Sequence, residues 1–288
     1  MANLRDIKNR IVSVKKSEKT TRAMKMVSAA KLRKTQERLD RFAHYADAYE
    51  GSKNSLMRRI GLDFRSIFFD KRNVKSEAVI LLTSDKGLCG SYNSNLIKKF
   101  DDYISSNHAV AKRLIYTIGT KGFDFFKKRL EINENYEKAS FSSIPEILKL
   151  SNKLKDLFLS KEIDQVVFIF NNLISKSRSE IALKTLLPVI IEEDETKDTA
   201  KFAVDYIYEP SKAELVDNYF SKYVDVQFER FIYASMASEN LARMTAMSIA
   251  SKNCEELIGA LTLQYNKARQ ASITKELLEI IGSAEAMR

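Results

Sequence analysis

The two ends of this chain lack the residues that normally interrupt helices. Residues 1–50 contain neither glycine nor proline, and no proline and only two glycines follow Pro210. One interior glycine costs a helix ~1 kcal/mol relative to alanine, which a long helix tolerates. The pattern predicts one helix up to a possible stop at Gly51. It predicts a second from Ser211 to about Ile281, just before Gly282, with a length of roughly 105 Å at 1.5 Å per residue.

Apolar residues recur at steps of three and four along both predicted helices. They are Leu4, Ile7, Ile11, Val14, Met24, Val27, Leu39, Phe42, Ala46 and Tyr49 in the first, and Cys254, Ile258, Leu261, Tyr265 and Ala268 in the second. A helix cannot bury such a stripe against itself, and the other end of the chain supplies a partner. The spacing therefore predicts a long antiparallel coiled coil of the N- and C-terminal helices.

The middle of the chain, about 76–208, has a different pattern. Short runs of β-branched and aromatic residues predict strands, and helical patterns separate the first of these. Strands are predicted at 78–84, 113–119, 164–172, 180–191 and 201–208, and helices at 93–106, 120–130 and 144–160. The alternation predicts a Rossmann-like α/β domain with helices on the faces of its sheet. The last two strands have no helix between them, so we expect them to pair as an antiparallel extension.

The fold class predicted from these patterns is α/β, with three parts. Residues 1–60 form the N-terminal coiled-coil helix, 76–208 the central α/β domain and 211–288 the C-terminal coiled-coil helix. At 288 residues the chain is long enough for a substantial core. No apolar run approaches the ~18–20 residues of a membrane span, and the first residues do not read as a leader, so we expect at most peripheral membrane association.

The positive charge of the chain is confined to its first segment. The formal net charge is +10, and residues 1–60 carry 16 Lys and Arg against 6 Asp and Glu, so the rest of the chain is balanced. This asymmetry indicates an acidic partner for that segment, whether nucleic acid, anionic lipid or acidic protein loops.

One loop invites a comparison with nucleotide sites. The segment TSDKGLCGSYN (83–93) directly follows an apolar run, as a phosphate-binding loop does. It has only Gly87 and Gly90, so it fits neither the dinucleotide fingerprint nor the P-loop pattern. The favoured interpretation is a tight strand-to-helix turn. With two cysteines and two histidines in unlike segments, a metal site or a Cys/His catalytic pair is not expected either.

Three segments together resemble the gamma subunits of F-type ATP synthases. They are RAMKMVSAAKLRK (22–34), TSDKGLCGSYNSN (83–95) and the long segment 237–280, and their order and spacing agree as well. The resemblance covers essentially the whole chain. Two departures are mild: Lys86 stands where arginine is common, and Ser91-Tyr92 where Gly-Phe is common.

The resemblance implies a rotor shaft with no catalytic site and no cofactor of its own. In the family the coiled coil enters a hexamer of alternating alpha and beta subunits, and the α/β domain lies near the epsilon subunit and the c-subunit ring. The chain is then expected to couple ion-driven rotation of the c ring to ATP synthesis or hydrolysis in the hexamer. The expected location is the cytoplasmic face of the bacterial plasma membrane, reached only through the complex.

The resemblance also implies contact residues. Arg269, Gln270 and Thr274 resemble hydrogen-bonding groups for a beta-subunit catch loop, while Lys25 and Lys86 resemble residues that meet acidic beta-subunit levers. The full sets are Met24, Lys25, Arg33, Lys86, Arg269, Gln270 and Thr274 for the hexamer, and Tyr206, Tyr208 and Glu209 for the c ring. Core packing remains an open alternative for Met24, because methionine fills irregular gaps.

Two rival functions remain at this stage. The basic first helix is compatible with a nucleic-acid-binding coiled coil, although no known module pattern accompanies it. The α/β domain is compatible with a nucleotide-handling enzyme, although no segment pairs a nucleophile with a base. Retention on duplex DNA would favour the first, and saturable binding of ATP or NAD to the isolated chain would favour the second.

Overall fold

The computed structural model describes residues 4–60, 64, 66–106, 110–136, 144–175, 177–190, 208–209 and 211–286. Its two long helices are α1 (Leu4–Ile60) and α5 (Lys212–Ala286). The chain divides into two compact units, one of residues 1–29 and 243–288 and the other of residues 30–242. This division cuts both long helices, so the three-part division expected from the sequence stays a prediction.

Both long helices run past the glycines that were expected to end them. Helix α1 passes through Gly51 to Ile60, and α5 passes through Gly282 to Ala286. Neither glycine adopts a positive φ, the conformation in which glycine ends a helix. After Gly51 the helix also buries Leu56 and Met57 in the core, which offsets the cost of the glycine. The two predicted stops are therefore wrong.

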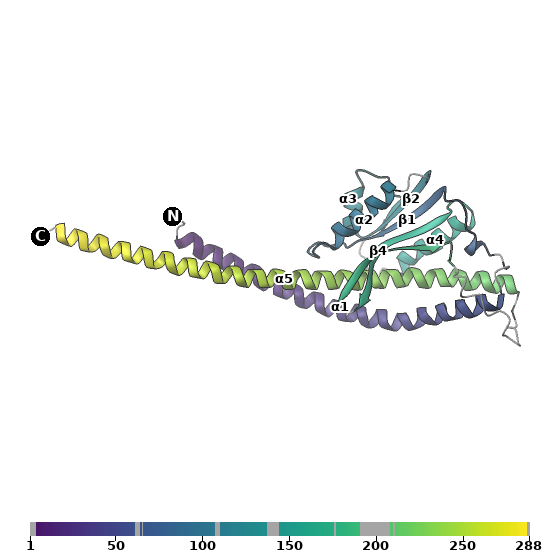
Figure 1. Cartoon of the computed structure of the whole chain (residues 1–288), viewed down its shortest axis with the longest axis horizontal. Coiled ribbons are helices and arrows are strands. Elements are labelled where there is room, and N and C mark those ends of the chain that lie inside the picture. The colour runs from purple at the N-terminus through teal and green to yellow at the C-terminus, as the bar shows by residue number, and fades with distance from the viewer. Residues whose placement is uncertain are drawn as a thin grey trace. The chain divides into compact units, whose positions relative to one another are not determined.

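In the first unit, the start of α1 and the end of α5 lie side by side and run in opposite directions (Figure 1). The hydroxyl oxygens of Thr21 and Ser251 are 2.8 Å apart, and Arg22 pairs with Glu255 at 2.9 Å. The apolar stripe is buried at Ile7 and Leu261, as predicted. The antiparallel pairing of the terminal helices is thus confirmed.

The second unit contains a five-stranded sheet. Its strands are β1 (Ser76–Leu82), β2 (Lys112–Ile118), β3 (Glu134–Tyr136), β4 (Gln165–Ser175) and β5 (Arg178–Leu187), in the order β3-β2-β1-β4-β5. The first four strands are parallel, and β5 is antiparallel to β4. Strand β1 lies in the middle and is buried from Glu77 onward, which accounts for its uninterrupted apolar run.

Helices cover both faces of the sheet (Figure 1). Val79 and Leu81 of β1 face α2 (Tyr92–Ser106) and α3 (Thr120–Phe126). Ala78 and Ile80, which point to the opposite face, pack in the larger core with α4 (Ile144–Leu159) and the first half of α5. Because successive strand residues alternate between faces, one strand supplies both cores. The predicted α/β class is confirmed.

Two details differ from the sequence-based prediction or lie beyond it. Strand β3 is only three residues long and was not predicted, because ENY carries no apolar run. The antiparallel strand is β5, which forms a hairpin with β4. The expected strand at 201–208 lies outside the described residues except for Tyr208, so its pairing stays a prediction.

Candidate partner-binding surfaces

The loop between β1 and α2 is folded onto its own side chains. Asn93 accepts a hydrogen bond from the Ser84 N–H at 3.1 Å and donates one to the Ser84 hydroxyl at 2.7 Å. The amide of Asn93 also lies 3.2 Å from the sulfur of Cys89, which is buried. The inside of the turn is therefore filled by protein groups.

The same loop satisfies the first N–H groups of the neighbouring helix α3. The Asp85 carboxylate accepts from Thr120 N, the Ser84 carbonyl from Lys121 N, and the Thr83 hydroxyl from Gly122 N, at 3.1, 3.1 and 2.9 Å. A phosphate at this corner would have to displace these groups and approach a carboxylate. The loop thus folds as a tight turn whose groups also satisfy the N–H donors at the start of α3.

Glycines allow this close approach. Gly119 has φ +103°, and a Cβ there would lie 2.1 Å from the Thr83 carbonyl oxygen. A Cβ at Gly122 would lie 2.9 Å from the Thr83 hydroxyl oxygen. Only residues without a side chain fit between the end of β1 and α3, so these two positions fix the loop against the body.

What the loop presents outward is one cation and one apolar side chain. Lys86 is exposed, as its predicted contact role requires. The side chain of Leu88 is 60% exposed. Sequence reasoning singled out Lys86 but missed Leu88.

Around the predicted contacts Met24 and Lys25, α1 has both inward-facing and outward-facing side chains. Met24 is half-buried, and Lys25 is exposed. The neighbouring Met26 and Val27 are the more exposed apolar residues, at 65% and 57%. The spacing places Val27 on the apolar stripe, but the buried residue at this level is Ser28. The small serine permits a closer approach of two helices than valine does.

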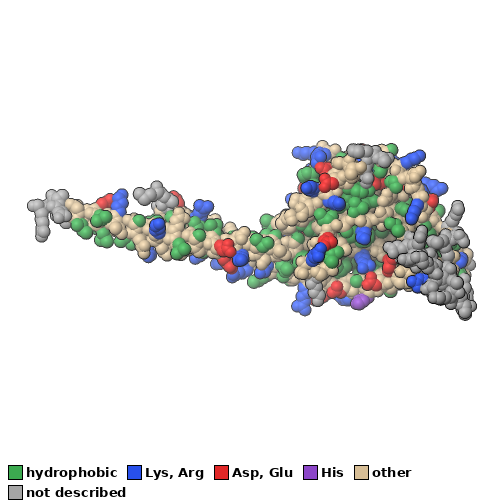
Figure 2. Space-filling model, viewed as in Figure 1, with side chains coloured by type: hydrophobic (Ala, Val, Ile, Leu, Met, Phe, Trp, Pro, Cys, Tyr) green, Lys and Arg blue, Asp and Glu red, His purple; other side chains and the backbone are tan. Residues whose placement is uncertain are grey.

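Near its end, α5 carries the other predicted hexamer contacts. Arg269, Gln270 and Thr274 are all exposed. This part of α5 extends beyond the start of α1 (Figure 1), and Figure 2 shows apolar and basic side chains together on the helices of this unit. The exposed apolar residues are Leu263, Ile273, Leu277, Leu278, Ile280 and Ile281. An apolar helix surface of this kind is typical of a protein-binding segment.

The remaining predicted residues lie in the second unit. Arg33 is exposed and forms an ion pair with Glu37 one turn along α1, at 3.0 Å. Tyr208 is half-buried with the Lys212 ammonium 5.2 Å from its ring centre, and Glu209 is exposed. Tyr206 lies outside the described residues.

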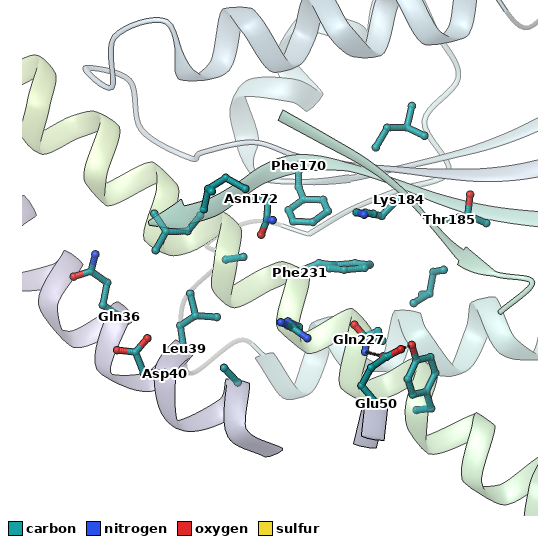
Figure 3. A pocket seen from close by; sticks show the side chains of 18 of the residues that line it. Gln36, Leu39, Asp40, Glu50, Phe170, Asn172, Lys184, Thr185, Gln227 and Phe231 are labelled. Carbon is teal, nitrogen blue, oxygen red and sulfur yellow. Dashed lines mark hydrogen bonds between the residues drawn. The ribbon is translucent and has the colours of Figure 1, made fainter. Parts of the chain in front are cut away.

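The second unit also contains a cavity of about 1250 Å³ between α1, α5 and the β4–β5 hairpin (Figure 3). Gln36 and Asp40 of α1 line one side, and Phe231 of α5 and Phe170 of β4 line others. Sequence analysis missed it because its walls come from α1, α5 and the β4–β5 hairpin, which are distant from one another along the chain. Its charged groups include neighbours that neutralise each other, such as Arg33 with Glu37.

At one end of the cavity a carboxylate joins α1 to α5. Glu50 accepts hydrogen bonds from the Tyr223 hydroxyl at 2.7 Å and the Gln227 amide at 3.2 Å, and it pairs with the buried Lys53 at 2.5 Å. Burial alone would raise the pKa of Glu50, but the hydrogen bonds from Lys53 and Tyr223 outweigh burial and hold the pKa below its ordinary value. The carboxylate is thus a structural anion rather than a proton donor near neutral pH.

The described residues show neither a metal-binding cluster nor a membrane-spanning helix. Among them, no three His, Cys, Asp or Glu side chains gather closely enough to hold a metal ion. None of the described helices is long and apolar enough to cross a bilayer.

The terminal helices pair in antiparallel fashion, and both carry exposed basic and apolar side chains. Beside the α/β domain, these surfaces are those of a protein that binds larger partners. A family described as ATP synthase matches residues 3–287. The chain is 42% identical over 290 residues to the ATP synthase gamma chain of Geobacter metallireducens, with 100% of each covered. It is 41% identical over 292 residues to that of Trichlorobacter lovleyi, again with 100% of each covered. The chain therefore belongs to the ATP synthase gamma chain family and is a subunit of an ATP synthase.

The fold also matches a solved structure. A chain in the cryo-EM structure of Euglena gracilis mitochondrial ATP synthase (OSCP/F1/c-ring, rotational state 3) aligns with a TM-score of 0.66 at 20% identity. The match covers 99% of this chain and 94% of that one. At this identity the match bears on the fold, and it agrees with the long helices and the α/β domain described above.

Proposed function

We propose that the chain is the central rotor shaft of an F-type ATP synthase. In this role it transmits ion-driven rotation of the membrane c ring to the alpha–beta hexamer, where ATP is made or hydrolysed, and it has no catalytic site of its own. The observation that carries the proposal is the 42% identity to a gamma chain over the full length of both proteins. The partners are the alpha, beta and epsilon subunits and the c ring, and membrane association runs through the complex at the cytoplasmic face of the bacterial plasma membrane.

The arrangement of the helices supports a mechanical role. Two antiparallel helices that bury Ile7, Ser28 and Leu261 between them resist twisting better than a single helix does. The exposed cations of α1 attract acidic partners. Because each exposed ion pair contributes only ~0–1 kcal/mol, no single pair holds the helix strongly in one position. Such weak contacts suit a shaft that rotates, because its partners must not bind it strongly at one rotation angle.

The test of this proposal is coexpression of the other subunits with and without the chain. We expect a membrane complex that couples ATP hydrolysis to ion pumping only when the chain is present. The purified chain by itself should hydrolyse no ATP. A complex that pumps ions equally well without the chain contradicts the proposal.

A second experiment addresses the proposed hexamer contacts near the end of α5. Arg269→Ala combined with Gln270→Ala should lower ATP-driven ion pumping of the assembled complex by about tenfold, as expected if hydrogen bonds to a charged group are lost. Because both side chains are exposed, the Tm of the isolated chain should stay within about 1 °C.

The matched control for that experiment is Lys252→Ala combined with Asn253→Ala, which removes two exposed side chains from an earlier turn of α5. It should leave pumping unchanged. Equal pumping by the Arg269/Gln270 variant and the wild-type complex would rule out the catch-loop role of these residues.

A further inference from the structure

Two non-glycine residues of the described chain have a left-handed backbone, Leu88 with φ 62° and Lys161 with φ 63°. The left-handed conformation is unfavourable for any residue with a Cβ, so each case requires an explanation. Lys161 has an ordinary one. It follows the end of α4, and the next N–H, that of Glu162, bonds back to the Leu157 carbonyl at 2.9 Å, which closes the helix.

Leu88 ends no helix. It lies in the loop between β1 and α2, with Gly87 before it and Gly90 two residues later. A glycine at position 88 itself would adopt this backbone without strain. The sequence nevertheless has a large apolar side chain there, and that side chain is 60% exposed rather than packed in the core. Neither backbone preference nor core packing accounts for the leucine.

The loop beneath Leu88 holds it in a fixed place. The Ser84 hydroxyl donates to the Lys86 carbonyl at 2.7 Å, and Asn93 bonds to Ser84 from the other side of the loop. Cys89, the residue that follows Leu88, is buried at 2% exposure. A strained and exposed residue on an anchored loop is the usual mark of a contact site, because the surrounding structure maintains the strain.

We infer that Leu88 is an apolar contact residue that inserts into an apolar pocket on a protein partner, next to the acidic groups of that partner that Lys86 is already expected to meet. The charge of the loop supports this pairing: Lys86 is exposed, whereas the Asp85 carboxylate is turned toward Thr120 of α3. A rigid protrusion suits a preformed protein pocket, whereas a fluid lipid surface gives it no advantage. The inference rests on the proposed function, in which the partner is a subunit of the same complex.

Variants that relieve the strain test the inference. Leu88→Asn and Leu88→Gly both accept the left-handed backbone and remove the apolar side chain. We expect the Tm of the isolated chain to rise or stay the same, while ATP-driven ion pumping of the assembled complex falls at least about fivefold. If the leucine served only the local structure, its replacement would not lower pumping while the Tm stayed the same or rose. Leu88→Met, which keeps a long apolar side chain, should retain pumping.

The matched control is Lys161→Gly, which relieves the same backbone strain at the end of α4 and should leave pumping unchanged. Pumping within twofold of wild type in Leu88→Asn overturns the inference, as does a lower Tm in both Leu88→Asn and Leu88→Gly. Cosedimentation of the chain with anionic phospholipid vesicles that is lost in Leu88→Asn would assign the leucine to a membrane and overturn it too. Failure of the proposed function gives a different result from failure of this inference, because pumping would then not depend on the wild-type chain at all.

Discussion

Gly119→Ala is expected to lower the free energy of unfolding by about 3 kcal/mol or more. Two costs act together. The backbone at this position has φ +103°, which alanine adopts only under strain. The new Cβ would also lie 2.1 Å from the Thr83 carbonyl oxygen, so β1 and α3 would have to move apart. Urea unfolding of the purified chain measures the loss.

Gly87→Ala is the matched control, since a Cβ at that glycine meets nothing within 4 Å. Its effect should stay within about 0.5 kcal/mol, as at an ordinary surface position. Equal stability of Gly119→Ala and Gly87→Ala would show that the loop does not need the close approach of Thr83 to Gly119. The attachment of Lys86 and Leu88 to the body would then require another explanation.

The second large effect is expected at the buried ion pair between α4 and α5. Lys155, which is 6% exposed, donates to the Asp225 carboxylate at 2.8 Å, and the Ser151 hydroxyl donates to the same carboxylate at 2.7 Å. Asp225→Ala leaves the Lys155 ammonium buried without its counter-ion. Breaking a buried pair from one side typically costs about 3–5 kcal/mol, and we expect a loss near 3 kcal/mol because Asp225 retains some contact with water.

A double variant separates the buried charge from the packing. Lys155→Met combined with Asp225→Leu removes both charges and keeps apolar volume, so it should recover most of the stability lost in Asp225→Ala. The measurement is again the urea midpoint and slope for each variant. If the double variant is as unstable as Asp225→Ala, the loss comes from side-chain packing or from Ser151 rather than from an unpaired cation.

The long helices and the class of the central domain could be predicted because their signals are local. The absence of proline and the three- and four-residue steps identify α1 and α5, and the apolar run before Thr83 identifies β1. The helix ends could not be predicted from Gly51 and Gly282, because a glycine ends a helix only where later contacts favour a left-handed turn. Those contacts come from residues that are distant along the chain, so the local sequence does not reveal them.

The contact surfaces were less predictable. Val27 fits the apolar stripe by spacing, yet Ser28 is the buried residue, since close helix approach selects for size as well as hydrophobicity. The left-handed φ of Leu88 occurs in a loop whose hydrogen bonds among Ser84, Cys89 and Asn93 form only when the loop folds. The cavity bounded by α1, α5 and the β4–β5 hairpin exists only once those segments have come together.

The Asp85 carboxylate occupies the start of α3, where a free nucleotide phosphate would otherwise meet backbone N–H groups. A strand–turn–helix corner with open N–H groups would attract the triphosphate tail of any passing ATP molecule. Here a resident negative charge holds that place, at 3.1 Å from Thr120 N, and repels soluble phosphates. A phosphate could therefore reach these N–H groups only by displacing the Asp85 carboxylate.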